Sequence, residues 1–176
     1  MSTLTTDPGF ARGQVLGVTK SLYDAEAGDG SHLYGVHKVF TDVDPVSGQI
    51  LSNETVECIA VKNESGGVLA AGTVVAFDLD KTLTCIDATA TTTSVRFGVV
   101  DEYIGSQGVP ANEVFWLVVK GPTKVLKKSG AIGIGVKVKI SATTGQIDAG
   151  TSPLVGIAID AAASDDTEVR VLAQIV

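Results

Sequence analysis

Cysteine, methionine and aromatic residues are scarce in this sequence. Its 176 residues include two cysteines, one methionine and one tryptophan, and aromatic residues make up 5% of the chain. Cys58 and Cys85 stand among residues that favour strands, in VECIAV and TLTCID, and no set of residues has metal-ligand spacing. We therefore expect two buried free thiols, with a disulfide as the alternative, and no metal or other cofactor.

Long apolar runs are also missing. The apolar fraction is 44% and the mean hydropathy +0.30, yet no stretch approaches the roughly 18 to 20 apolar residues of a membrane helix. The N-terminal MSTLTTDPGFARG has neither a basic start nor an apolar segment of the kind found in signal peptides. These absences predict a soluble chain that is made and kept in a cytosol and has no membrane partner.

Helix-forming runs are few, and strand and turn residues dominate instead. The 20 glycines interrupt almost every window in which a helix could form, while valine, alanine and threonine are abundant. This composition favours short strands joined by tight turns. The sequence therefore predicts an all-β protein.

Residues 1–54 differ from the rest of the chain. They carry Pro8, Pro45, seven acidic residues and polar clusters such as DAEAGDG and DPVSGQ, with only short apolar pieces between them. Such a segment buries little of its own surface, so we expect an extended N-terminal arm that a neighbour orders.

Strand signals recur every 8 to 12 residues across 55–176, the spacing of a sandwich or small barrel. Glu113–Lys120 is apolar apart from its ends, which predicts a strand buried on both faces. IGVKVKI at 134–140 alternates with a period of two, so Val136 and Val138 should face inward and the lysines outward. Further strands are expected at 55–61, 94–100 (with Val95, Phe97 and Val99 on one face) and in the segments LAAGTVVAF, PLVGIAID and TEVRVLAQIV.

The basic residues are unevenly distributed. Six lysines and no acidic residue lie between Val114 and Ile147, whereas the rest of the chain holds all 20 acidic residues and the other seven basic ones. A nucleic-acid patch is one interpretation. The segment has no arginine, and its two aromatic residues stand in a strand that should be buried. We therefore expect these lysines to lie on solvated edges or to face an acidic surface of another subunit. No nucleic-acid partner is expected.

The segment VVAFDLDKTLT at 74–84 resembles the first motif of the haloacid-dehalogenase phosphatases. By position, the resemblance makes Asp78 the nucleophile and Asp80 the general acid–base, with Mg²⁺ neutralising the phosphate. That fold needs a parallel sheet with helices after the motif, and the 92 residues that follow Thr84 show no βαβ alternation. The alternative interpretation is a polar turn after a buried strand.

Other possible sites are weaker. His32 and His37 have no carboxylate or cysteine partner at ligand spacing, and GAIGIG at 130–135 precedes a strand rather than the helix that a dinucleotide loop needs. An active site needs a converging set of residues, and the sequence offers none. We expect no catalytic residue, no cofactor-binding residue and no enzymatic activity.

Three segments of the C-terminal two-thirds resemble a known family. They are GVLAAGTVVAFDL, then GVVDEYIGSQGVPANEVFWLVVKGPTKVLKKSGAIGIGVKVKIS, then GQIDAGTSPLVGIAIDAAASDDTEVRVLAQI. Together they are similar to the head decoration (capsid cement) proteins of tailed bacteriophages, over roughly residues 56–176. The DLDKT string is not part of that family pattern.

This resemblance implies a small β-barrel, often trimeric, on the outer face of a phage capsid. There it would bridge neighbouring subunits of the major capsid protein, in virions assembled in a bacterial cytoplasm, so the expected partners are that protein and further copies of the chain. The domains expected are an arm at 1–54 and a decoration domain at 55–176. Another phage structural module, such as a tail or fibre-base component, is the alternative. The side chains expected to contact the partner are the larger apolar ones of the arm: Leu22, Tyr23, Leu33, Tyr34, Val39 and Phe40.

Overall fold

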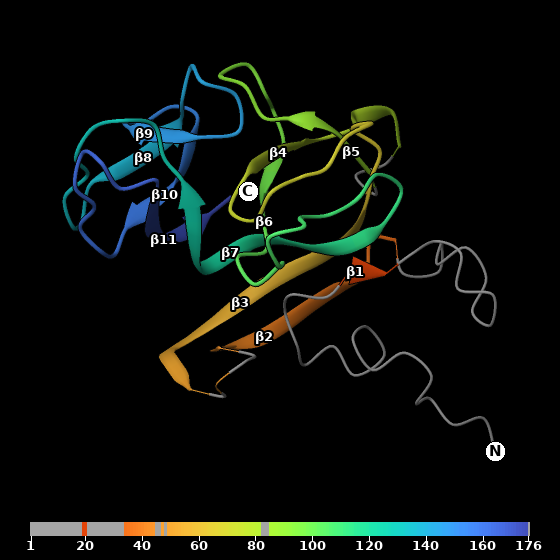
Figure 1. Ribbon diagram of the computed structural model, residues 1–176, viewed down its shortest axis with the longest axis horizontal. Helices are drawn as coiled ribbons and strands as arrows, with labels where there is room; N and C mark the ends of the chain where they lie inside the picture. The colour runs from red at the N-terminus through yellow and green to blue at the C-terminus, as the bar shows by residue number, and fades with distance from the viewer. Residues whose placement is uncertain (1–18, 21–33, 45–46, 48, 82–84, 176) are drawn as a thin grey trace.

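The computed structural model describes residues 19–20, 34–44, 47, 49–81 and 85–175 (Figure 1). Strands form nearly all of its regular structure, together with one 3-10 turn, η2, at Leu79–Lys81. The prediction of an all-β protein is therefore confirmed. The strands are β1 Thr19–Lys20, β2 His37–Val43, β3 Ile50–Asn63, β4 Val74–Phe77, β5 Cys85–Thr89, β6 Phe97–Val100, β7 Val114–Leu126, β8 Lys137–Ile140, β9 Ile147–Ala149, β10 Leu154–Ala158 and β11 Glu168–Gln174.

All of these strands belong to one sheet. Its order is β2-β3-β5-β4-β6-β7-β11-β10-β8-β9, and β1 pairs with β7 beside this path. The sheet as a whole is not closed, because its path begins at β2 and ends at β9. Its pairings are antiparallel except for β3 with β5.

Five of the strands form a ring of pairings within this open sheet. β3 pairs with β5, β5 with β4, β4 with β6, β6 with β7, and β7 returns to β3. Each of the five contributes at least one side chain to a single buried apolar cluster, so the ring has a packed interior. The cluster includes Val61, Val75, Phe77, Ile86, Val100, Phe115 and Leu117.

The C-terminal strands curl in a similar way at the other end of β7. β7 pairs with β11, β11 with β10, β10 with β8 and β8 with β9, and a bridge between Lys127 and Ile147 links β9 back to the residue after β7. A second buried cluster fills this part and continues under the β2–β3 hairpin to Phe40 and Cys58. In Figure 1 the two curled parts stand next to each other over opposite ends of β7, which belongs to both.

Gly121 marks the point where β7 passes from one part to the other. Residues up to Lys120 pair with β3, and residues from Lys120 onward pair with β11. The φ of Gly121 is +106°, and a Cβ at this position would lie 2.2 Å from the carbonyl oxygen of Thr55. A side chain is therefore excluded here by both conformation and space.

Most of the expected strands form. The segment from Val114 to Val118 is buried at every residue, as predicted, but β7 then continues through Gly121 and Pro122 to Leu126. In β8 the side chain of Val138 is buried and that of Lys137 exposed, which confirms the period of two. Val95 differs from the expectation: it is 76% exposed and precedes β6, so it does not share the buried face of Phe97 and Val99.

Candidate interaction surface

A β-hairpin extends beyond the body of the molecule. It consists of β2 and the first half of β3, and Figure 1 shows the beginning of β3 lying away from the two curled parts. The far end carries exposed apolar side chains, with Ile50 65% and Leu51 38% exposed. Because they lie away from the core, these side chains are accessible to a partner from either face of the hairpin. We call Ile50 and Leu51 the hairpin tip.

The hairpin is fixed to the body by a buried ion pair. The guanidinium of Arg170, on β11, donates to both carboxylate oxygens of Asp42, on β2, at 2.8 and 2.7 Å. The Asp42 side chain is 1% exposed and also accepts a hydrogen bond from the hydroxyl of Ser52, on β3. A carboxylate buried to this degree needs its partner, so the pair ties β2 of the hairpin to β11 of the body.

Glu102 places a second carboxylate in the same region. Burial raises the pKa of its carboxyl group, and the positive charges of Arg170 and Lys124 partly offset that rise. One of its oxygens accepts a hydrogen bond from the backbone amide of Lys124 (3.2 Å). Arg170 binds Asp42 directly, and its charge also acts on Glu102 together with that of Lys124. We call Asp42, Glu102 and Arg170 the hairpin anchor.

The arm residues expected to contact a partner have different environments. Leu22, Tyr23 and Leu33 lie outside the described residues. Val39 is 60% exposed on the outer face of β2, whereas Tyr34 is half-buried and packs against the core. Phe40 is 3% exposed and meets the ring of Trp116 edge-on, with 5.2 Å between centroids, so its side chain belongs to the core.

The expected boundary between arm and domain falls inside a strand. β3 runs without interruption from Ile50 to Asn63, so residues on both sides of the 54/55 boundary belong to it. The sequence does not predict the hairpin tip, because Ile50 and Leu51 directly follow the polar cluster DPVSGQ. A turn sequence followed directly by two aliphatic residues is the signal that could have identified it.

An apolar depression lies beside the hairpin, on the outer face of the sheet. Its volume is about 170 Å³. It is flanked by His37 and Arg96, and the apolar residues that line it are Ile59, Phe77, Phe97, Val119 and Ile175. His37 therefore lies at a surface depression, while His32 is outside the described residues.

The phosphatase-like segment forms a turn. β4 ends at Phe77, pairs antiparallel with both β5 and β6, and is followed by η2. The amide of Asp80 donates to a carboxylate oxygen of Asp78 (2.9 Å), so Asp78 stabilises the turn. The phosphatase interpretation requires a parallel sheet and a following helix here, whereas among the described residues β4 pairs antiparallel and is followed by η2 and β5.

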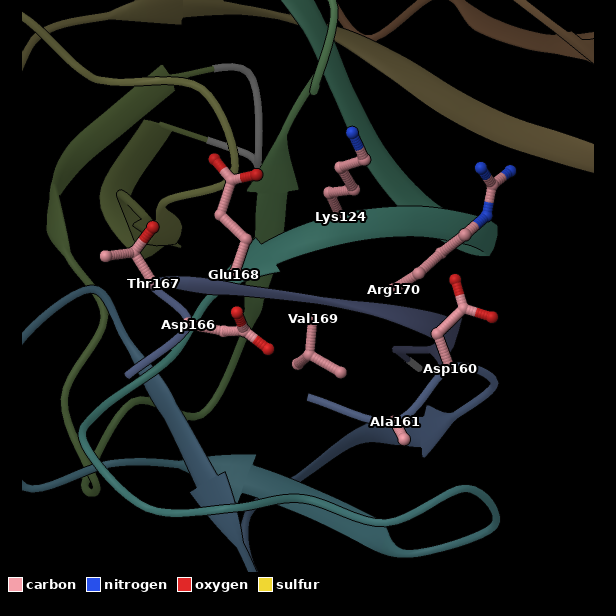
Figure 2. A pocket seen from close by; sticks show the side chains of 8 residues that line it. All are labelled: Lys124, Asp160, Ala161, Asp166, Thr167, Glu168, Val169 and Arg170. Atoms are coloured by element: carbon pink, nitrogen blue, oxygen red, sulfur yellow. The ribbon is translucent and has the colours of Figure 1, made fainter. Parts of the chain in front are cut away.

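A second hollow, of about 310 Å³, lies at the start of β11 (Figure 2). Its lining includes Asp160, Asp166 and Glu168, but Figure 2 shows that their carboxylates do not converge on one point. Across the described part of the chain, no group of three histidine, cysteine or acidic residues is arranged to hold a metal ion.

Two of the six lysines between Val114 and Ile147 have partners within the chain. Lys127 is 3% exposed, and its ammonium donates to the carbonyls of Lys128 and Gly130. Lys120 forms an ion pair with Glu57 across the β7–β3 ladder (2.8 Å). The positive charges of Lys127 and Lys120 therefore lie in different environments, one buried and one exposed.

We predict that Cys58 reacts with a thiol reagent only when the protein opens. Its side chain is fully buried, and burial raises the pKa of the thiol well above its ordinary value, so the reactive thiolate is suppressed. Cys85→Ser removes the other cysteine. In this variant, labelling near pH 8.5 should be slow in buffer and fast in denaturant. Equal rates in the two conditions would contradict the prediction.

In the described part of the chain, no helix is long and apolar enough to span a membrane.

No protein family and no curated protein matches the sequence. Among solved structures, the chain is similar to the N base of the head fibre protein gp8.5 of bacteriophage phi29. That similarity has 14% identity and a TM-score of 0.44, over 67% of this chain and 94% of the other. A similarity of this extent assigns neither a fold family nor a function to the chain.

Proposed function

We propose that the chain is a structural component of a phage virion that binds the outer surface of the capsid. In this role it cements neighbouring subunits of the major capsid protein and acts as a homo-oligomer without catalytic activity. The observation that carries the proposal is the projecting hairpin, which presents Ile50 and Leu51 to solvent while the hairpin anchor fixes its base.

The physical case rests on rigidity and repetition. A standard protein interface covers roughly 800 Å² per partner, and a hairpin held by a buried ion pair loses little conformational freedom when it binds. Several such contacts in one symmetric oligomer add through effective concentration, so attachment becomes nearly permanent even where each contact is weak. A protein that binds only the assembled lattice also stabilises that lattice. The family resemblance of residues 56–176 supports the same role.

The test is sedimentation with expanded empty phage heads from the natural source. We expect the full chain to co-pellet with heads and to saturate at a fixed ratio to capsid subunits. The double variant Ile50→Asp/Leu51→Asp should bind at least about tenfold more weakly, which corresponds to about 1.4 kcal/mol of binding free energy. Its thermal unfolding should match that of the unmodified chain, because both side chains are exposed.

The matched control is Val68→Asp/Ile134→Asp. These residues are 64% and 71% exposed, and neither belongs to the hairpin, so the same charge is added elsewhere on the surface. The control should bind heads normally. Co-pelleting with tails instead of heads would favour the tail or fibre-base alternative, and binding to neither particle would overturn a virion role.

A further inference from the structure

Two basic residues line the apolar depression beside the hairpin. They are His37 and Arg96, both exposed, and every other residue that lines the depression is apolar. Its volume is about 170 Å³. Pockets for small-molecule ligands are larger, at roughly 300–1,000 Å³. The depression therefore has room for one large side chain rather than for a cofactor.

Backbone pairing holds both basic residues in place. His37 is the register partner of Ile59 in the β2–β3 ladder. The backbone amide of Phe77, at the end of β4, donates a hydrogen bond to the carbonyl of Arg96 (3.1 Å). Because the backbone on both sides is already fixed, little conformational freedom is lost when a partner binds there.

The two basic side chains are available to a partner of opposite charge. Glu57, on the same strand as Ile59, forms its ion pair with Lys120, and Asp78 accepts a hydrogen bond within its own turn. No acidic residue in the described part of the chain forms an ion pair with His37 or Arg96. A guanidinium and an imidazole both donate hydrogen bonds to carboxylates. The complementary group is therefore a carboxylate.

Exposed apolar side chains adjoin the depression. Val39 is 60% exposed and shares a face of β2 with His37, because residues two apart on a strand point to the same side. Val95, which is 76% exposed, directly precedes Arg96. A small free ligand would leave both valines in water, whereas a protein segment that continues beyond the depression can cover them. This surface therefore fits a protein better than a small molecule.

From the size of the depression, its two basic residues and its apolar surroundings, we infer that it is a docking site for a segment of a partner protein. That segment presents one large apolar side chain next to an aspartate or a glutamate. The apolar side chain fills the depression, while Arg96 and His37 bind the carboxylate beside it. The inference does not depend on the proposed capsid role, because the geometry selects the chemistry of the segment and not the protein that carries it.

Titration of the full chain with short peptides, followed by NMR, tests the site. The probe is the capped hexapeptide GSFDSG, and the methyl signals of Ile59 and Ile175 report on the depression itself. We expect GSFDSG to shift both signals in a saturable manner. GSFKSG, with the charge reversed, and GSGDSG, without the apolar side chain, should bind at least about fivefold more weakly. Equal binding of the three peptides, or no shift of either methyl signal, would overturn the inference.

A charge-reversal variant tests the same contact from the side of the protein. Arg96→Glu should weaken the binding of GSFDSG at least about tenfold and strengthen that of GSFKSG, because like charges repel and opposite charges attract. Lys137→Glu is the matched control: it makes the same change of charge at an exposed residue of β8 and should leave both affinities unchanged. Equal effects of the two variants would mean that only the net charge of the protein matters, against the inference.

Two further measurements identify other occupants of the depression. Analytical ultracentrifugation without peptide shows whether Arg96→Glu, but not Lys137→Glu, dissociates an oligomer of the chain. That result would make the depression an interface between copies of the chain. Binding of 3-phenylpropionate at least as tight as that of GSFDSG would assign it to a small carboxylate instead. We expect neither result, and either one would overturn the inference of a partner protein.

Discussion

Replacing Arg170 with methionine should lower the free energy of unfolding by about 3–5 kcal/mol. Methionine retains most of the length of the side chain but removes both hydrogen bonds to Asp42, whose side chain is 1% exposed. The carboxylate then remains buried, and among the described residues only the Ser52 hydroxyl still donates a hydrogen bond to it. Chemical denaturation followed by tryptophan fluorescence measures the loss, because Trp116 lies in the same buried cluster as Phe40.

Two further variants test whether burial of the Asp42–Arg170 pair causes the expected loss of stability. Lys120→Met breaks the ion pair between Lys120 and Glu57, whose N–O distance is also 2.8 Å. Those side chains are 62% and 41% exposed, so this variant should cost far less stability than Arg170→Met. Asp42→Asn/Arg170→Met removes both charges and should recover part of the loss. A cost for Arg170→Met as small as that for Lys120→Met would mean that the anchor does not hold the hairpin.

Phe40→Ala should destabilise the protein by about 3–5 kcal/mol. The Phe40 ring is 3% exposed and packs against Trp116, so its loss leaves a cavity where the hairpin meets β7. Thermal and urea unfolding check this expectation. The same experiment decides whether Phe40 acts mainly in the core or at a partner surface.

Val39→Ala is the matched control for Phe40→Ala. The two residues are adjacent on β2, but Val39 is 60% exposed on the opposite face, so its truncation should change stability by less than about 0.5 kcal/mol. If Phe40→Ala left stability unchanged and abolished capsid binding, the original prediction of Phe40 as a contact residue would hold.

The fold class was predictable because strand periodicity is local. The alternation in 137–140 and the apolar run from Val114 to Val118 both became strands with the expected burial. The path of the sheet was not predictable, since β3 pairs with β5 and β7 across long sequence separations. Such pairings depend on the packing of two cores, which no local pattern records.

The candidate surface was harder to predict than the fold. Adjacent residues of a strand face opposite sides, so Val39 and Phe40 look equally apolar in the sequence but have opposite environments. The hairpin anchor joins Asp42 to a residue 128 positions away, and neither partner stands in a recognisable motif. Short-range patterns identify apolar residues, but tertiary packing decides which of them remain available to a partner.

The position of β7 affects how the molecule would respond to mechanical load. A pull on the hairpin tip along the strand axis would draw β3 lengthwise past β7, whose paired residues run from Glu57 to Lys62 on the β3 side. Under this shearing load the hydrogen bonds between β3 and β7 all resist the separation of the two strands at once. A force perpendicular to the strands would break them one at a time. Because β7 belongs to both cores, the load would be shared by both halves of the body, as a fastening between subunits of an expanding shell would require.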